Sequence, residues 1–452
     1  MTLSIKFLGA TGTVTGSRYL LTLNDKRIMI DCGMFQGLKD LRLRNWDHFP
    51  VDPEKIDAIL LTHAHLDHSG YLPRLVKMGF KGKVFATHST TALCNILYPD
   101  AAHIQEEDAN FLNRKKLSKH KPALPLYTLE DARAALKLFH SVDWDKTTEA
   151  FGFKIRFLPI SHLLGASFIA IEADGKKIVF SGDVGRDKDP ILPERYFMEK
   201  TDYIVCESTY GDRLHPDNDV KEELSEVISK TINRGGTVLI PSFAVGRSQA
   251  LIYIINQLKL NARIPDVPVY LNSPMAIEAT KTHFNFSTEL KMPKEKLVEA
   301  LKDITYAKTP NQSEQIDKNK TPKIVISSSG MLVGGRILHH LKSMGPDPKN
   351  SIVLVGFQAA GTRGEALAKG KKELKVHGQM IPIQAEVHAI QNLSGHADYK
   401  GVLEWLSHFK NRPQKVFITH GEPKASEAMK EHIVKQFQWD TVLPQYKEEF
   451  TL

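Results

Sequence analysis

The feature that most constrains this chain is a cluster of metal-ligand side chains directly after a short apolar segment. Residues Ile56–Leu61 are mostly aliphatic and bounded by polar residues, which predicts a buried strand. The next seven positions, 62–68, read Thr-His-Ala-His-Leu-Asp-His and contain three histidines and one aspartate. Imidazole and carboxylate groups are the usual ligands of zinc. The sequence therefore predicts a metal site in the loop at this strand's carboxyl end, before a helix that starts near Tyr71.

Ligand-type residues recur at the ends of other expected strands. Five strands each lead to such a residue: Arg27–Ile30 to Asp31, Phe153–Ile160 to His162, Lys177–Phe180 to Asp183, Tyr203–Cys206 to Glu207, and Lys415–Thr419 to His420. Open α/β sheets place their chemistry outside the carboxyl ends of their strands. We therefore expect these side chains to belong to one site with the histidine cluster.

Seven of these residues suit two zinc ions. We expect the first ion to be bound by His63, His65 and His162, and the second by Asp67, His68 and His420. Asp183 is expected to bridge the two ions. Paired metals about 3.5–4 Å apart hold a hydroxide that is nucleophilic at neutral pH, and they neutralise charge at an attacked phosphorus. Those two properties meet the main requirement of phosphodiester hydrolysis, in which an anionic nucleophile approaches an anion.

The leaving oxygen of such a reaction also needs a proton. His396 lies outside the expected metal set, and we predict that it is the general acid. Glu207 is also outside that set and is expected to hydrogen-bond His396, orient it and raise its pKa. Asp67 completes the predicted catalytic group, and Asp31 is expected to orient a ligand histidine. A structural role for His396, or its place as a ligand instead of His420, stays open.

From about Gly211 the chain changes to strand–loop–helix units, which predict a second α/β domain with a parallel sheet. Ligand-type residues return after an expected strand at Glu386–Ile390, so this domain is expected to be an insertion. We predict that residues 1–208 and 389–452 form the first domain and that residues 209–388 form the second. Strand-end residues that could hold phosphate there are Arg247, Ser328, Ser329 and Arg363. Helix capping is an equally good explanation for each serine.

Composition sets broader limits. A chain of 452 residues is too long for one core, and 42% hydrophobic with 25% charged residues is ordinary for a soluble globular protein. No apolar run approaches the roughly 20 residues that span a bilayer, and residues 1–7 resemble a strand more than a signal peptide. Three cysteines are too few for a disulfide framework, so we expect a cytoplasmic protein without membrane contact. The net charge of +8 slightly favours a nucleic-acid partner. The basic run Arg114–Lys121 is interpreted as solvated surface.

These motifs resemble the metallo-β-lactamase superfamily, through the His-x-His-x-Asp-His run and the His, Asp and His downstream. The match is closer to the β-CASP branch of nucleases, which carry an inserted domain and three later motifs, matched here by Glu207, His396 and His420. Asp31, within Met-Ile-Asp-Cys-Gly, matches the family's first motif, and the loops Pro-Ser-Phe-Ala-Val-Gly-Arg and Ser-Ser-Gly-Met look like β-CASP segments. The resemblance covers essentially the whole chain. It extends to the nuclease subunit of the cleavage and polyadenylation factor and its prokaryotic relatives.

The resemblance implies an αββα metallo-β-lactamase sandwich with an inserted β-CASP domain as a lid, and RNA in the groove between them. It implies a zinc-dependent ribonuclease. The leading hypothesis is endonucleolytic processing or decay of single-stranded RNA, and the alternative is 5′ exonuclease action. His420 stands where DNA-acting members tend to have an apolar residue, and this implies RNA. A homodimer is compatible with the sequence. The C-terminal domain of ribonuclease J is not matched, which argues against that assignment.

Three other classes of protein fit the sequence less well. A small-molecule metallohydrolase of the thioesterase or lactamase type needs only the metal core, and would leave the insertion and the pair Glu207 and His396 unexplained. A catalytically dead scaffold would have lost ligands, whereas every expected ligand position is occupied here. A flavodiiron-type oxidoreductase needs an acidic residue where His65 stands. The sequence therefore favours the ribonuclease.

Overall fold

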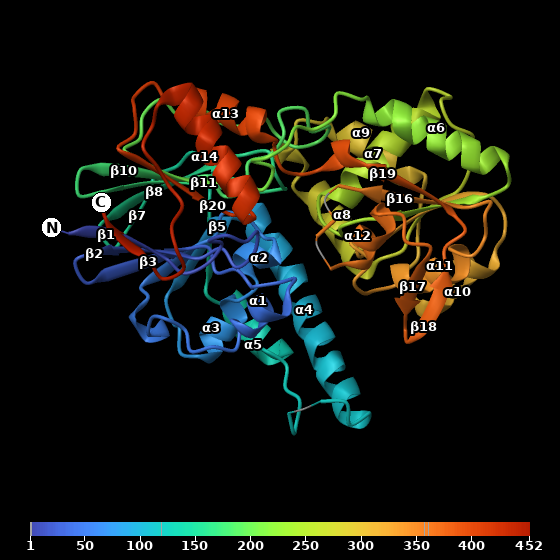
Figure 1. The fold of residues 1–452 in the computed structure, drawn as a ribbon, viewed down its shortest axis with the longest axis horizontal. Coiled ribbons are helices and arrows are strands. Elements are labelled where there is room, and N and C mark those ends of the chain that lie inside the picture. Colours follow the sequence, from blue (N-terminus) through green and yellow to red (C-terminus); the bar gives the residue numbers. More distant parts are fainter. Residues whose placement is uncertain (1, 119, 357, 360) are drawn as a thin grey trace. The chain divides into compact units, whose positions relative to one another are not determined.

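The computed structural model describes residues 2–118, 120–356, 358–359 and 361–452, and it divides into two compact units (Figure 1). Unit 1 comprises residues 1–189, 193–214 and 396–452, and unit 2 comprises residues 190–192 and 215–395. The inserted position of unit 2 matches the expected order, although both breaks fall a few residues after the boundaries expected from sequence. Lys119 of the basic run and Phe357 and Ala360 of an expected strand-end loop lie outside the described residues.

Unit 1 is built on two sheets with seven strands each among the described residues. In spatial order, the first contains β22 (Glu449–Thr451), β1 (Leu3–Phe7), β2 (Tyr19–Leu23), β3 (Lys26–Ile30), β4 (Ala58–Leu60), β5 (Lys83–Thr87) and β6 (Phe139–Val142). The second contains β21 (Thr441–Val442), β20 (Lys415–Thr419), β11 (Tyr203–Glu207), β10 (Lys176–Phe180), β9 (Ser167–Ala173), β8 (Phe153–Pro159) and β7 (Thr148–Ala150). Strands β3 to β6 run parallel, as do β10, β11 and β20, so their carboxyl ends meet at common edges.

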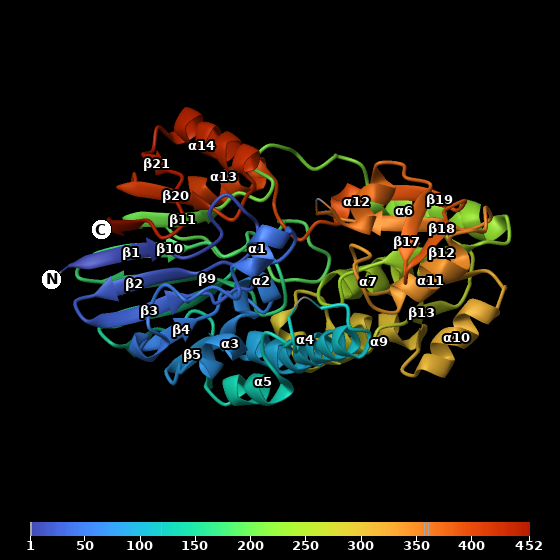
Figure 2. The same ribbon diagram turned by 60° about the horizontal axis from the view of Figure 1, so that its bottom comes forward.

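Helices lie outside the two stacked sheets of unit 1 (Figure 2). Those next to the first sheet are α1 (Lys39–Leu43), α2 (Leu66–Ser69), α3 (Leu72–Lys77), α4 (His88–Arg114) and α5 (Leu129–Leu136), with the 3₁₀ turn Pro53–Lys55. Those next to the second are α13 (Tyr399–Ser407) and α14 (Pro423–Phe437). This arrangement confirms the predicted αββα sandwich.

The core of unit 1 lies between the two sheets, because each strand turns its apolar side chains inward. In β1, for example, Leu3, Ile5 and Phe7 are buried while the alternate residues are partly exposed. Rings from opposite sheets pack directly, with Phe7 and Phe417 centred 5.1 Å apart. This packing fixes the strand ends of one sheet relative to those of the other, and the candidate site is built on those ends.

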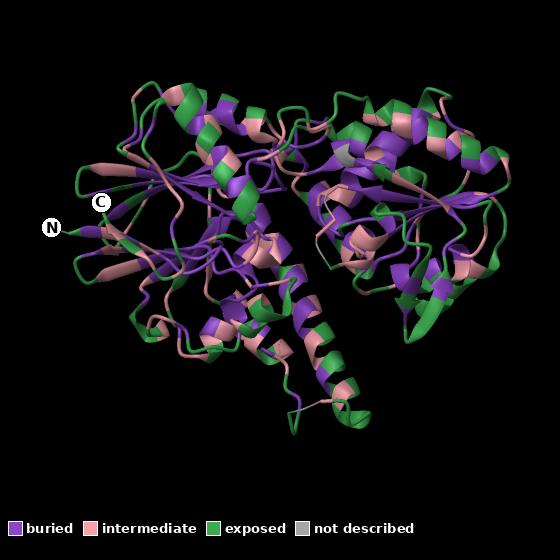
Figure 3. Ribbon diagram, in the orientation of Figure 1, coloured by how far each residue is buried: buried purple, intermediate pink, exposed green. Residues whose placement is uncertain are grey.

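Unit 2 is built on a parallel sheet, as predicted. In spatial order its strands are β14 (Ile304–Tyr306), β13 (Val269–Leu271), β15 (Lys323–Ser327), β12 (Thr237–Pro241), β16 (Ser351–Val355) and β19 (Glu386–Ile390), and a separate hairpin pairs β17 (Glu373–Val376) with β18 (Gln379–Pro382). Its helices are α6 (Val220–Asn233), α7 (Arg247–Leu260), α8 (Pro274–Asn285), α9 (Lys294–Lys302), α10 (Pro310–Lys318), α11 (Ile337–Met344) and α12 (Arg363–Ala368), with 3₁₀ turns at Ser287–Glu289 and Gln391–Leu393. The sheets of both units are mostly buried, whereas exposed residues concentrate on the helices and turns (Figure 3).

The structure corrects one element of the expected division. The strand at Glu386–Ile390 was expected to lead into the first domain, but β19 pairs in parallel with β16 over its full length and belongs to the sheet of unit 2. Hydrogen bonds between strands outweigh proximity in sequence here, and they carry unit 2 as far as Gly395. In the part of the chain that the structure describes, no helix is long and apolar enough to cross a membrane.

Candidate metal centre

The strand-end residues of both sheets meet at one edge of unit 1. His63 and His65 follow β4, and the chain then enters α2, a short helix that was not expected, at Leu66. The helix expected near Tyr71 is present as α3. Asp67 and His68 therefore lie on a short helix and not in a loop, because the backbone of residues 65–69 closes one helical turn in which His68 N and Ser69 N donate to His65 O. The remaining ligand-type residues come from the second sheet: His162 after β8, Asp183 after β10 and His420 after β20.

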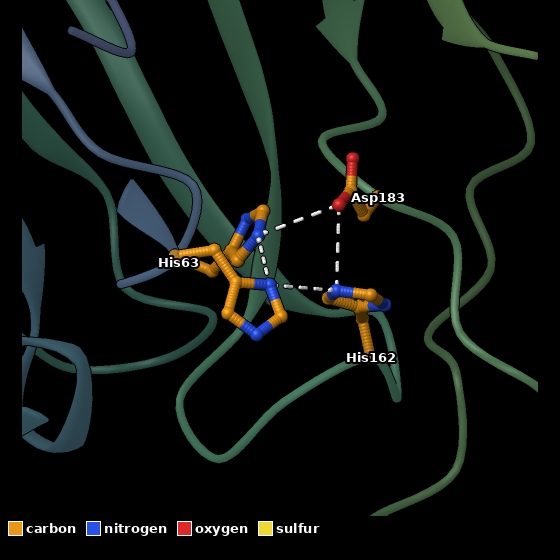
Figure 4. Close-up of side chains that lie close together, drawn as sticks. His63, His162 and Asp183 are labelled. Atoms are coloured by element: carbon orange, nitrogen blue, oxygen red, sulfur yellow. Dashed lines mark hydrogen bonds and ion pairs between the residues drawn. The ribbon is translucent and has the colours of Figure 1, made fainter. Parts of the chain in front are cut away.

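The first cluster joins three histidines to one oxygen of Asp183 (Figure 4). Nδ1 of His65 lies 3.2 Å from Nε2 of His63 and 3.2 Å from Nε2 of His162. Oδ2 of Asp183 lies 3.5 Å from Nε2 of His63 and 3.3 Å from Nε2 of His162. Except for His65, which is partly buried, these residues are buried. The four polar atoms thus surround one small volume.

The second cluster uses the other oxygen of Asp183. Nε2 of His68 lies 3.1 Å from Nε2 of His420, which is 3.5 Å from Oδ2 of Asp67. Oδ1 of Asp183 lies 3.1 Å from Nε2 of His68 and 3.5 Å from Nδ1 of His420. Asp183 therefore faces the first cluster with one carboxylate oxygen and the second cluster with the other, which is the arrangement that a bridging ligand needs.

The donor atoms of both clusters fit bound metal ions. A neutral imidazole has one N–H, so a ring nitrogen that faces two others at 3.2 Å, as in His65, cannot be paired with both by ordinary hydrogen bonds. Tetrahedral zinc with bonds of 2.0–2.1 Å would place its ligand atoms about 3.3 Å apart. Oδ1 of Asp183 is buried and accepts no hydrogen bond within the described residues, although an ionised carboxylate needs such partners. A cation in each cluster would satisfy these atoms.

The protonation states of three site residues suit metal ligands. His68 is the exception, because Asp183 and Asp31 raise its pKa well above the ordinary value against the effect of burial. Burial opposes ionisation of Asp67, but its hydrogen bond from His420 and the nearby histidines lower its pKa to about 2. The pKa of Asp183 is held well below its ordinary value, against the effect of burial, by four surrounding histidines. Burial and the neighbouring His68 hold the pKa of His63 well below its ordinary value. Two carboxylates are therefore ionised and His63 is neutral near pH 7, as metal binding requires.

Several residues outside the clusters orient the ligands. Oδ2 of Asp31 lies 2.7 Å from Nδ1 of His68, and Asp31 in turn accepts from the backbone N–H of Thr62 at 2.7 Å. Thr62 Oγ1 lies 3.1 Å from Nδ1 of His63, and Thr209 Oγ1 lies 3.0 Å from Nδ1 of His420. Neither threonine was predicted from sequence, although Thr62 directly precedes His63 and Thr209 lies in the same strand-end segment as Glu207.

The backbone around the site is strained at the same places. Asp31 has φ 58° and His420 has φ 50°, in the left-handed region that residues with a side chain seldom adopt. Such conformations persist only where the surrounding structure fixes them, and they concentrate at functional sites. In this protein they turn each side chain sharply off the end of its strand and toward the clusters.

His396 and Glu207 form a pair beside the clusters. Nδ1 of His396 lies 3.1 Å from Oε2 of Glu207, and Nε2 of His396 lies 3.8 Å from Oδ2 of Asp183. Burial opposes protonation of His396, but the carboxylates of Glu207 and Asp183 raise its pKa to about 9. Glu207 is buried and also accepts hydrogen bonds from the backbone N–H groups of Val184 and Thr209. These hydrogen bonds hold Glu207 in place beside His396. The raised pKa keeps His396 protonated at neutral pH.

The four residues predicted to hold phosphate lie in unit 2. The guanidinium of Arg363 donates to the carbonyls of Lys375 at 2.7 Å and Leu332 at 3.0 Å. Ser329 Oγ accepts from the N–H groups of Val333 and Gly334. Ser328 Oγ is buried and has no hydrogen-bond partner among the described residues, and Arg247 is the first residue of α7. Arg363 and Ser329 thus hold their own loops together, and phosphate binding by the four residues stays a prediction.

Comparison with known proteins places the chain in a family. Three family models match it: "Metallo-beta-lactamase superfamily" over residues 11–225, "Beta-Casp domain" over residues 248–367, and "Zn-dependent metallo-hydrolase RNA specificity domain" over residues 380–444. Ribonuclease TTHA0252 of Thermus thermophilus is 34% identical over 421 residues, which cover 92% of each chain. The chain belongs to the β-CASP family of metallo-β-lactamase proteins. It is therefore a hydrolase of this family.

Two further relatives and one solved structure are similar to most or all of the chain. An RNase J-like protein of Methanocaldococcus jannaschii is 31% identical over 97% of each chain. The transcription termination factor FttA of Methanosarcina mazei is 31% identical, with 96% of this chain matched to 69% of that protein. A protein of unknown function from Enterococcus faecalis V583 shares the fold over the full length of both chains, with a TM-score of 0.56 at 14% identity.

Proposed function

We propose that this β-CASP protein is a zinc-dependent ribonuclease that hydrolyses phosphodiester bonds of RNA with two metal ions. The observation that carries the proposal is the position of Asp183, which presents one oxygen to each histidine cluster. His396 and Glu207 lie beside the clusters and supply a proton donor that a simple metal core would lack. The relatives named ribonuclease and the matched "RNA specificity domain" support RNA as the substrate.

Each residue of the site has a proposed role. His63, His65 and His162 would hold one zinc ion, and Asp67, His68 and His420 the other, with Asp183 between them. When bound, such a pair lowers the pKa of water toward neutrality and neutralises charge on the scissile phosphate. His396 gives its Nε2 proton to the leaving oxygen, and Glu207, on the opposite ring nitrogen, keeps that proton directed toward the clusters.

Finer features of the function are part of the same proposal. We infer internal cleavage of single-stranded RNA in processing or decay, with 5′ exonuclease action as the alternative outcome. The protein would act in the cytoplasm, as a monomer or a homodimer. Three free, buried cysteines are in keeping with a reducing compartment.

Cleavage of a single-stranded RNA labelled at its 5′ end tests the proposal. The purified protein is assayed with zinc, with a chelator, and as the His396→Ala variant. Labelled fragments of intermediate length that disappear with the chelator, and in the variant, support an endonuclease that uses His396 as the acid. Labelled mononucleotide as the sole product would instead establish 5′ exonuclease action. No cleavage of RNA, together with turnover of a thioester or lactam, would overturn the ribonuclease assignment.

A further inference from the structure

The basic run at the end of α4 has no part in the metal centre. Residues 114–121 carry five formal positive charges and no acidic residue, in a chain whose total net charge is +8. The described cations of this run, named here the α4 arm, are Arg114, Lys115, Lys116 and Lys121. None of them forms an ion pair with a carboxylate of the described residues. The four described cations of the α4 arm thus equal half of the chain's net charge of +8, and they have no acidic partner among the described residues.

The arm has a defined shape because its base is tied to α4. Asn113 Nδ2 donates to the carbonyl of Ala123 at 3.0 Å, and Ala123 N donates back to Asn113 Oδ1 at 2.8 Å. Leu126 N donates to Oε1 of Gln105, one further point of attachment along the helix. The positive charges are therefore presented together at the end of a helix. Phe111, on the last turns of α4, leaves 48% of its surface exposed beside them.

The other end of α4 packs directly on the metal-ligand segments. Tyr98 donates its hydroxyl to the carbonyl of Ser69, at the end of the helix that carries Asp67 and His68. Thr87 and Thr90 both donate to the carbonyl of Gly165, in the loop that begins at His162. From there α4 extends away from the sheets of unit 1, and its far end is largely exposed (Figures 1 and 3).

We propose that the α4 arm is a second binding site for the RNA strand whose scissile phosphate lies at the metal centre. The inference rests on the proposed ribonuclease function and adds a site on unit 1 for the distal part of the substrate. Unpaired lysines and arginines attract phosphates, and an exposed aromatic ring such as Phe111 offers a face for a base. The acidic residues Glu107 and Asp108 lie on earlier turns of α4, so the attraction is confined to its end.

The length of α4 sets the size of the RNA that can use both sites. The 17 steps along the chain from Tyr98 to Lys115 span about 26 Å of helix at 1.5 Å per residue. A stacked strand rises about 3.4 Å per nucleotide along its axis, so this distance corresponds to about eight nucleotides. An RNA of about six nucleotides would reach only the metal centre, and one of about 24 nucleotides would reach the arm as well.

The test measures binding of 6- and 24-nucleotide oligouridine to the zinc-loaded protein, by fluorescence anisotropy at several salt concentrations, with every protein in the slowly cleaving His396→Ala background. The arm variant Lys115→Ala/Lys116→Ala/Lys121→Ala should bind the 24-mer at least tenfold more weakly near 0.1 M salt. The slope of log affinity against log salt should fall by about 2, from about 0.7 for each lost phosphate contact on a single strand. Affinity for the 6-mer should stay within twofold of the wild type.

Two matched variants separate the arm from general effects of charge and folding. Replacing the same three lysines by arginine should retain the affinity and the salt slope for the 24-mer. Replacing three exposed lysines of α9, Lys294, Lys296 and Lys302, by alanine should change neither by more than about twofold. Equal binding of the 24-mer by the arm variant and the wild type would overturn the inference. Weaker binding by the arm variant that is explained entirely by a change in its oligomeric state would overturn it as well. A wild type that cleaves neither RNA with zinc present would overturn the ribonuclease proposal instead.

Discussion

Both units contain buried histidines, but the two sets face different neighbours. In unit 1 the ring nitrogens of His68 and His420 lie 3.1 Å apart, and those of His63 and His162 both lie 3.2 Å from His65. In unit 2 the buried histidines contact protein groups, although Nε2 of His283 has no hydrogen-bond partner among the described residues. His340 lies 2.6 Å from Oδ1 of Asp317 through Nδ1 and 2.6 Å from Nδ2 of Asn272 through Nε2, and Nδ1 of His283 lies 2.8 Å from the carbonyl of Ala279.

Residue type and burial therefore do not identify a metal site in this protein, whereas the neighbours of each ring nitrogen do. His340 completes a network in which Asn272 also binds Ser313 and Arg336, so no position is left for a ligand. The histidines of unit 1 bring acceptor atoms together, and Asp183 adds an oxygen without a hydrogen-bond donor. In unit 2, His340 and Arg363 are held by protein groups, whereas the clustered ligand atoms of unit 1 suit a cation.

The largest effect should follow from removing the carboxylate that serves both clusters. Asp183→Asn takes one charge from each cluster, so bound metal should fall below half of the wild-type content. RNA cleavage should fall by more than 100-fold, beyond the 10–100-fold typical of residues that only support a ligand. Metal content by atomic emission and single-turnover cleavage measure the two effects.

Asp317→Asn is the matched change in unit 2, because this carboxylate also contacts a buried histidine. It should lower the free energy of unfolding but leave metal content and cleavage near the wild-type values. Equal loss of metal in the two variants would contradict the distinction between the units.

The next effect concerns the proton donor beside the clusters. His396→Ala should lower the cleavage rate by about 10²–10⁴-fold, the usual contribution of a general acid, while metal content stays unchanged. In the wild type the rate should fall as pH rises through about 9, because His396 loses its proton there. Glu207→Gln removes the carboxylate that raises this pKa, so the alkaline fall should move to lower pH. An alkaline limb at the same pH in wild type and Glu207→Gln would argue against His396 as the acid.

A smaller effect is expected from the residue that orients His68. Asp31→Asn keeps the size of the side chain but weakens the 2.7 Å contact with Nδ1 of His68. Affinity for zinc should fall 10–100-fold, as for other carboxylates that support a ligand histidine. Competition with a chromophoric chelator measures this affinity. An unchanged affinity would show that Thr62 and the strand end hold His68 without Asp31.

The meeting of the candidate ligands was predictable from sequence because ligand-type residues follow apolar strands, and parallel strands bring their carboxyl ends together. This pattern predicted the approach of His162, Asp183 and His420 to the histidine cluster. It could not predict that Asp67 and His68 lie on a helix, because one helical turn leaves no periodic signal. The roles of the two orienting threonines depend on distances between side chains, which spacing in sequence does not encode.

The layers of helices and sheets were predictable from sequence, but the residues at which one unit ends and the other begins were not. The strand–loop–helix rhythm indicates a parallel sheet in unit 2, but it does not reveal which edge accepts the last strand. Pairing of β19 with β16 decides that question through hydrogen bonds between residues 35 positions apart, such as Ser351 and Glu386. Similarly, an arginine at a strand end can bind phosphate or its own loop, and the carbonyls around Arg363 became evident only in the structure.

The smallest predicted effect tests the structural histidines of unit 2 by pH. Burial lowers the pKa of His283 to about 4, against the opposing hydrogen bond with the carbonyl of Ala279. Between this value and the ordinary value near 6.5 the unfolded chain binds more protons, so stability falls as pH decreases through this range. Lowering the pH from 7 to 5.5 should therefore remove about 1 kcal/mol from the free energy of unfolding through this residue alone.

The His283→Leu variant isolates that contribution, because the other titrating groups are the same in both proteins and cancel in the difference. Urea unfolding of the two chelator-treated proteins should show that the variant loses about 1 kcal/mol less than the wild type over the same pH range. Parallel pH profiles would show that His283 takes up a proton without cost, for instance by exposure to water through local opening. A steeper fall in the wild type would instead confirm that this histidine is a neutral core residue, in contrast to the ligand histidines of unit 1, whose protonation competes with a metal ion.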